Sequence, residues 1–131
     1  MALGKIDHIE VLVDDLEKAE EYFTKRLGFK LLRRVWEGKG LELTSPAGDF
    51  FFNLYQGSEE LYKRERERPG GPCHFSHIAF KVDDINKEFE ELKSKGVSFR
   101  EESPLHFNPI TGRTLVGVRD ADGCWWLQLT S

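Results

Sequence analysis

Two stretches of this chain carry the same phrase: residues 8–19 read HIEVLVDDLEKA, and residues 77–88 read HIAFKVDDINKE. Among the first nine positions of each stretch, six agree or nearly agree. Each stretch opens with apolar residues at alternate positions, which indicates a strand with one face packed on a core. Two aspartates and apolar residues at helical spacing follow, and they predict an N-capped amphipathic helix. A histidine, His8 or His77, opens each strand.

The repeat extends to the end of the chain. Turn residues and β-branched or aromatic runs predict three further strands after each helix, at residues 29–37, 40–45, 49–56, 97–102, 113–120 and 124–131. The GDFFFNLY of the first copy aligns with the GCWWLQLT of the second, so Asn53 corresponds to Gln128. A repeat of about 70 residues is too long for a solenoid unit and predicts two fused βαβββ modules.

The charged segment between the copies predicts the domain organisation. It contains KRERER, in which both signs occur, and PGGP, which continues neither a helix nor a central strand. We expect a single domain over residues 1–131, made of module 1 (about 1–57), a charged Pro/Gly linker (about 58–74) and module 2 (about 75–131). Because the charges of the linker cancel, we interpret it as a solvated face with a short helix rather than a binding tail.

Composition excludes several classes of function. The chain has 131 residues, 39% hydrophobic and 32% charged, with a formal net charge of −4, so it is expected to be soluble and not to bind nucleic acid. No apolar run approaches the length that spans a bilayer, and the N-terminus lacks the pattern of a signal peptide. Cys73 and Cys124 lie far apart without C-x-x-C spacing, which favours a reducing, cytoplasmic location over a disulfide framework.

The doubled strand–helix phrase, together with the D-A-D-G turn of RDADGCWWLQL, resembles the vicinal oxygen chelate superfamily. That group includes glyoxalase I, methylmalonyl-CoA epimerase, extradiol dioxygenases, and the fosfomycin- and bleomycin-resistance proteins. The resemblance covers both modules. It implies an α+β fold in which the two modules form curved mixed sheets around a shared cavity, and it implies a homodimer.

In the metal enzymes of this superfamily, the ligands come from the first and last strands of each module. Carried over by position, the resemblance implies a divalent ion (Zn, Ni, Mn or Fe) held by His8, Asn53, His77 and Gln128. The residues themselves favour a common cleft, because apolar neighbours on the opposite face flank each amide. An amide in such a setting must meet a polar partner or a cavity, since burying it unpaired costs several kcal/mol.

The last strands depart from the pattern of the metal enzymes. Those enzymes usually place a carboxylate there, most often within D-P-D-G-x-x-x-E-L, whereas here Gln128 comes one residue later. A bulge near Trp125 and Trp126, or a longer turn, would absorb the extra residue. Two imidazoles and two amides bring no negative charge to an ion, and an amide does not titrate, so it cannot transfer protons.

Two glutamates are candidates for the missing carboxylate. Glu10 lies two residues beyond His8 on the same strand face, and Glu42 lies in the predicted strand at 40–45. Either could complete a ligand set or act as a base; the alternative is a solvated position at the rim of the cavity. Glu10 and Gln128 are therefore the candidate catalytic residues, Gln128 as part of the ligand shell.

Four residues are candidates for lining the substrate cavity. Phe51 and Trp126 are predicted on the same side as the amides, where aromatic walls suit a flat or apolar molecule, although core filling is the alternative. His106 is predicted in a surface loop that could cover the cavity. Arg113 could contact an anionic substrate or could be an ordinary surface charge.

Two functional hypotheses follow, and the sequence leaves open whether the chain is an enzyme. The first is a metal-dependent lyase, isomerase or dioxygenase that acts on a small substrate with adjacent oxygens. The second is a metal-free protein that binds an aromatic or cationic drug-like molecule, with which the net negative charge is compatible.

Overall fold

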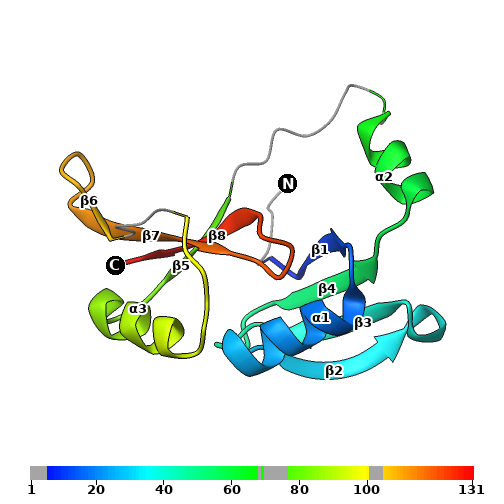
Figure 1. The fold of residues 1–131 in the computed structure, drawn as a ribbon, viewed down its shortest axis with the longest axis horizontal. Helices are drawn as coiled ribbons and strands as arrows, with labels where there is room; N and C mark the ends of the chain where they lie inside the picture. The colour runs from blue at the N-terminus through cyan, green and yellow to red at the C-terminus, as the bar shows by residue number, and fades with distance from the viewer. Residues whose placement is uncertain (1–5, 68, 70–76, 101–104) are drawn as a thin grey trace, which may run out of the picture. The chain divides into compact units, whose positions relative to one another are not determined.

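The computed structural model describes residues 6–67, 69, 77–100 and 105–131, without the side chains of the two adjacent tryptophans near the C-terminus. The chain divides into two compact units, Met1–Cys73 and His74–Ser131, and each is described by itself. Figure 1 shows the strands and helices of both units.

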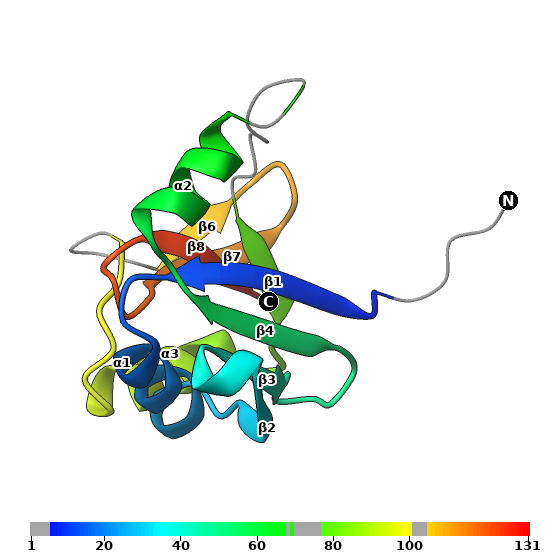
Figure 2. The ribbon, with the colours of Figure 1, turned by 90° about the vertical axis from the view of Figure 1, so that its right-hand side faces the viewer.

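Both units follow the order β-α-β-β-β. The bounds are β1 His8–Val13, α1 Leu16–Glu21, η1 Tyr22–Arg26, β2 Lys30–Val35, η2 Trp36–Gly38, β3 Gly40–Thr44, β4 Phe51–Gln56, α2 Glu59–Arg66, β5 Ile78–Lys81, α3 Ile85–Ser94, β6 His106–Asn108, β7 Arg113–Arg119 and β8 Trp125–Thr130. Unit 1 contains η1, η2 and α2 in addition to that order. The strands of the described residues form two four-stranded sheets, ordered β1-β4-β3-β2 and β5-β8-β7-β6. β1 and β4 run parallel side by side (Figure 2), as do β5 and β8, and the remaining pairs are antiparallel. The predicted α+β fold of two βαβββ modules is thereby confirmed.

One face of the first sheet packs against α1 and η1. The side chain of Asp15 caps α1 by accepting a hydrogen bond from the backbone N–H of Lys18 (3.1 Å). The ring of Phe23 lies 5.9 Å from that of Phe52, and both side chains are buried. Since successive residues of a strand point to opposite faces, Asn53 lies on the face opposite the helix.

The second unit repeats this arrangement with α3. Asp84 caps the helix, and Ile85, Phe89 and Val116 form a buried cluster between the helix and the sheet. The backbone of Gly96 has a φ of 78°, which lets the chain leave the helix in a conformation that L side chains rarely adopt. None of the helices in the described ranges has the length and hydropathy needed to span a bilayer.

The segment after α3 differs from the prediction. Residues 97–102 were expected to form a strand, but the described part of the segment pairs with β7 only through a bridge between Phe99 and Val118. Two backbone hydrogen bonds flank this bridge, from Arg100 N–H to Gly117 O and from Arg119 N–H to Ser98 O (both 3.0 Å). The guanidinium of Arg119 also donates to the carbonyl oxygens of Phe99 (3.1 Å) and Arg100 (3.2 Å). The edge strand of this sheet is instead β6, and residues 101–104 lie outside the described residues.

Candidate functional site

Four polar side chains form a row across the first sheet. In the strand register, Glu10 of β1 lies opposite Asn53 of β4, which lies opposite Glu42 of β3, which in turn lies opposite Arg33 of β2. Paired residues share a sheet face, and neighbouring strands are about 4.8 Å apart. We call Glu10, Asn53, Glu42 and Arg33 the polar row; it lies on the face opposite α1.

Asn53 at the centre of this row carries an unpaired acceptor. Its Oδ1 atom is shielded from solvent and has no hydrogen-bond partner among the described residues. A buried acceptor left unpaired costs about 1–3 kcal/mol. Such an atom in a native structure is therefore a place where a donor from outside the described residues would be stabilising.

Glu42 is already paired with a cation. The Arg33 guanidinium donates from Nε to Oε1 (3.2 Å) and from Nη2 to Oε2 (3.1 Å) of this carboxylate. The Glu42 side chain is 19% exposed, whereas that of Arg33 is 67% exposed. The carboxylate is thus held within the sheet surface, and the guanidinium covers it from the solvent side.

Glu10 lines a surface hollow together with residues of α2 and of the segment directly after it. The hollow is open to solvent, has a volume of about 510 Å³, and is lined by Glu10, Arg64, Glu65, Glu67 and Pro69. Ligand pockets commonly have volumes of about 300–1,000 Å³. Glu10 itself is exposed, which agrees with the solvated rim that the sequence offered as an alternative.

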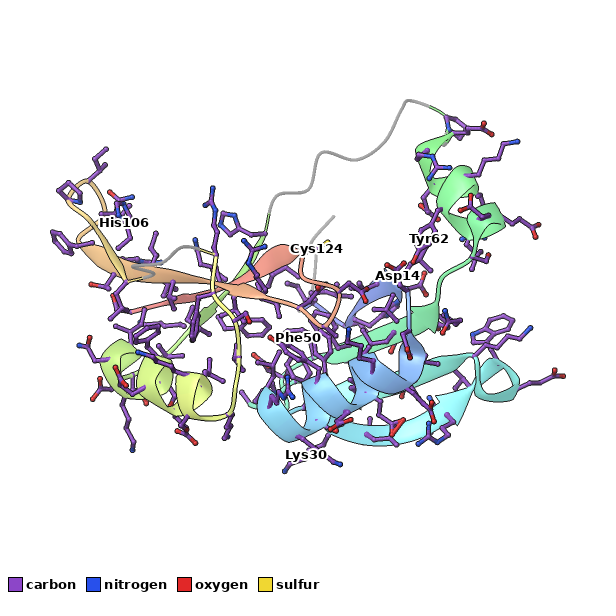
Figure 3. All side chains as sticks on the ribbon, viewed as in Figure 1. Asp14, Lys30, Phe50, Tyr62, His106 and Cys124 are labelled. Carbon is purple, nitrogen blue, oxygen red and sulfur yellow. The ribbon has the colours of Figure 1, made fainter. Side chains whose placement is uncertain are left out.

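Helix α2 is tied to the sheet beside this hollow. The Tyr62 hydroxyl donates to Asp14 Oδ1 (2.5 Å), and Figure 3 shows the two side chains pointing toward one another. A Cβ atom at Gly57 would clash with the Tyr62 hydroxyl, so a side chain there would push the tyrosine away. The Tyr62 side chain thus helps to position α2, which lines the hollow.

His8 lies on the same face as the polar row, at its edge. It pairs in register with Phe51, and this pair lies two residues before the pair of Glu10 and Asn53. Its Nδ1 is 2.8 Å from Asp7 Oδ2, and both side chains are largely exposed. Phe51 precedes Asn53 by two residues, so it lies on the same face of the sheet, and it is 36% exposed. That it lines a substrate cavity stays a prediction.

The second sheet places Gln128 in the equivalent position. Gln128 of β8 lies between Ala79 of β5 and Gly117 of β7. His77 precedes Ala79 by two residues, as His8 precedes Glu10, so the amides and histidines correspond as aligned. Glu10 and Glu42, however, are matched by Ala79 and Gly117, so the carboxylates of the row belong to unit 1.

A bulge in β8 brings Gln128 into this register. Val118 pairs with Leu127 and Arg119 pairs with Trp125, so the backbone of Trp126 is an extra residue on its strand. The bulge expected from the late position of the amide is thus present. The side chain of Trp126, a predicted cavity residue, lies outside what the structure describes.

The D-A-D-G turn before β8 is structural. Asp120 Oδ1 accepts from the backbone N–H groups of Asp122 (2.9 Å) and Cys124 (3.0 Å), while Arg119 Nη1 donates to the carbonyl oxygen of Gly123 (2.7 Å). Figure 3 shows Cys124 in this turn. The motif shapes the entry into β8 and supplies no side chain to the row.

The predicted lid residue His106 does not lie in a loop. It belongs to strand β6, where it pairs with Leu115, and it is exposed (Figure 3). Arg113, also predicted at the cavity, starts β7 opposite Asn108 and is exposed. The loop prediction was wrong because the prolines, Pro104 and Pro109, fall on either side of His106–Asn108, which leaves these three residues free to pair with β7. Whether either side chain reaches a cavity stays a prediction.

A sequence model of the Glyoxalase/Bleomycin resistance protein/Dioxygenase superfamily matches residues 5–127. The chain belongs to this superfamily. It is 29% identical to the uncharacterised protein YwkD of Bacillus subtilis (strain 168), over 93% of each chain.

Two further relatives of this superfamily member are informative. A probable lactoylglutathione lyase of Vibrio parahaemolyticus is 32% identical, over 94% of this chain and 88% of that protein. The crystal structure of SMU.1112c matches with a TM-score of 0.74 at 24% identity, over 99% of this chain and 100% of that one, and shows the same fold.

The superfamily is generally metal-dependent, which makes the donor set of this chain informative. Among the described residues, no group of three or more His, Cys, Asp or Glu side chains could hold a metal ion. Unit 1 offers His8, the Asn53 amide, a Glu42 carboxylate engaged by Arg33, and a Glu10 carboxylate facing the hollow. Zn²⁺ and Fe²⁺ are normally held by imidazole, thiolate and carboxylate. The donors within either unit therefore do not fit such an ion, and the expectation that His8 and His77 meet at one cleft stays a prediction.

The sequence did not indicate Arg33 or Tyr62 as functional residues. Arg33 lies opposite Glu42 because the register of β2 shifts between Leu31 and Arg33, which leaves Leu32 as an extra residue. Nothing in an apolar run marks such a shift. Tyr62 lies in the charged linker, where the only available signal was one aromatic residue among charges.

Proposed function

We propose that this superfamily member binds a small organic molecule on the polar face of unit 1, without a divalent metal ion. The observation that carries the proposal is the shielded and unpaired Oδ1 of Asn53 at the centre of the polar row. An acceptor of this kind gains a hydrogen bond when a ligand donor reaches it, and the hollow at Glu10 offers room for the ligand.

The chemistry of the amides favours binding over proton transfer. Asn53 and Gln128 do not titrate, so neither can act as the base that isomerase or epimerase chemistry requires. Glu10 is the remaining candidate base of the row, and its exposure leaves its carboxylate well solvated. Phe51, which flanks the row, adds an apolar surface suited to a ligand with a flat or apolar part.

Elemental analysis of untagged protein tests the proposal. We expect far less than one metal ion per chain after purification without chelators. We also expect no rise in melting temperature with Zn²⁺, Ni²⁺, Mn²⁺ or Fe²⁺, because only ligands that bind the folded state stabilise it. An ion retained at about one per chain, and lost in His8→Ala, would overturn the proposal.

A second candidate is a metal-dependent lyase acting on a substrate with adjacent oxygens. It is favoured by the 32% identity to a probable lactoylglutathione lyase. This function needs His8 and His77 to approach each other, with Asn53, Gln128 or a glutamate completing the shell. Lactoylglutathione lyase activity that appears on adding Ni²⁺ or Zn²⁺ and disappears in His77→Ala would establish it.

The remaining expectations from the family resemblance are a homodimer and a cytoplasmic location. Both are proposals. Light scattering coupled to size-exclusion chromatography tests the first, with twice the chain mass of 15.2 kDa as the expected result.

A further inference from the structure

We infer that the ligand of this face is an organic cation with N–H donors, of the guanidinium or primary ammonium kind, which takes the place of Arg33 on Glu42 and donates to Asn53. This inference rests on the proposed function and adds a ligand class to it. It uses the polar row and the hollow, both within unit 1.

The first argument is that one carboxylate of the polar row, Glu42, already binds a guanidinium, that of Arg33. Glu42 presents both carboxylate oxygens to Arg33, at 3.2 Å from Nε and 3.1 Å from Nη2. Bidentate pairing of this kind is geometrically specific for a planar, forked donor. Since Arg33 is largely exposed, the pair is one that a competing cation can exchange.

The second argument is the chemistry beside that pair. Asn53, next to Glu42 in register, has an unpaired acceptor, and Glu10, on its other side, has no hydrogen-bond or ion-pair partner among the described residues. Three neighbouring side chains thus present acceptor oxygens. A ligand with several N–H groups satisfies them, whereas an anionic ligand would meet carboxylates on both sides.

The third argument is the charge of the hollow into which the row leads. Glu10, Glu65 and Glu67 line it together with one cation, Arg64, whose Nη2 is bound to Glu65 Oε1 (3.1 Å). Among the described residues that line the hollow, three carry a carboxylate and one carries a guanidinium. Such an excess of negative groups favours a cationic ligand over an anionic one.

Calorimetric titration with agmatine tests the inference, because agmatine joins a guanidinium to a primary ammonium. We expect binding that weakens as salt is added. Glu42→Gln should weaken it about ten-fold or more, the usual loss for a charged hydrogen-bonding group. Arg33→Ala should strengthen it about two- to five-fold, since breaking an exposed ion pair is no longer required. Glu90→Gln, the same charge change on the exposed face of α3, is the matched control and should leave binding unchanged.

Asn53 variants test the role of the amide. Asn53→Leu should weaken agmatine binding about ten-fold, and Asn53→Asp, which keeps the acceptor and adds a charge, should strengthen it. Because the two changes act in opposite directions, a general loss of folding cannot mimic the pattern. Tetramethylammonium, a cation without N–H donors, should bind far more weakly than agmatine.

Failure of this inference can be told apart from failure of the proposed function. If the protein is metal-free but agmatine does not bind at millimolar concentration, the ligand class is wrong and metal-free binding still stands. The same conclusion follows if Glu42→Gln behaves like Glu90→Gln, or if tetramethylammonium binds as well as agmatine. A bound metal ion at about one per chain refutes the proposed function whatever agmatine does.

Discussion

Replacing Asn53 by leucine should leave the fold as stable as before or make it more stable. The Oδ1 atom of Asn53 is shielded from solvent without a hydrogen-bond partner in the described part of the chain. Leucine has a similar volume and no polar atom, so the penalty of about 1–3 kcal/mol for an unpaired buried acceptor disappears. Some of that gain is lost to imperfect packing, and we expect a net increase of about 1 kcal/mol in the free energy of unfolding, or about 3–4 °C in melting temperature.

A second amide on the same strand provides the matched control. Gln56 donates from Nε2 to the carbonyl oxygens of Asp14 (2.6 Å) and Gly57 (3.2 Å), and its Oε1 accepts from the backbone N–H of Leu16 (3.0 Å). Gln56→Leu leaves these backbone groups without a hydrogen-bond partner. It should lower the free energy of unfolding by about 2–4 kcal/mol, because more than one hydrogen bond is lost. The same chemical change thus has opposite signs at the two positions.

Urea denaturation followed by circular dichroism measures both effects. The reasoning requires a positive change in unfolding free energy for Asn53→Leu or none, and a clear loss for Gln56→Leu. A loss of more than about 1 kcal/mol for Asn53→Leu, similar to that of Gln56→Leu, would show that the Asn53 amide has a partner in the free protein. The ligand-binding argument would then lose its central observation.

Three further predictions concern the frame around the site. Tyr62→Phe removes the hydrogen bond to Asp14 (2.5 Å) and should speed backbone hydrogen exchange in α2 without changing exchange in α3; equal rates in α2 of both proteins would refute the role of this contact. Phe52→Ala, at a fully buried ring, should lower the unfolding free energy by about 3–5 kcal/mol, while Phe107→Ala, at a ring 60% exposed, should change it by less than about 0.5; similar losses would contradict the assigned core. Asp120→Ala removes an acceptor for two backbone N–H groups and should cost about 1–3 kcal/mol in urea denaturation, and no loss would mean that the D-A-D-G turn forms without it.

The strand–helix phrases were predictable because their signals are local. Alternation from His8 and from His77 defines which face of each first strand is buried, and Asp15 and Asp84 cap the helices as their positions indicate. The same alternation on β4 placed Asn53 opposite the buried Phe52. An internal repeat strengthened each assignment, since two copies of one pattern predict one topology.

The row of polar residues was only partly predictable, because it depends on register between strands. Alternation placed Glu10 on the face of His8 but left the orientation of Glu42 open. Its pairing with Arg33 follows from a one-residue shift in β2 that no sequence pattern marks. The bulge at Trp126 was foreseen only because the repeat put Gln128 one residue late.

The measurement that most directly tests the central claim is elemental analysis of untagged protein, paired with agmatine calorimetry on the same sample. Metal-free binding at the polar face predicts far less than one ion per chain together with a binding isotherm that Glu42→Gln weakens. A preparation that retains about one divalent ion per chain, and loses it in both His8→Ala and His77→Ala, would contradict that claim and favour the metal-dependent lyase.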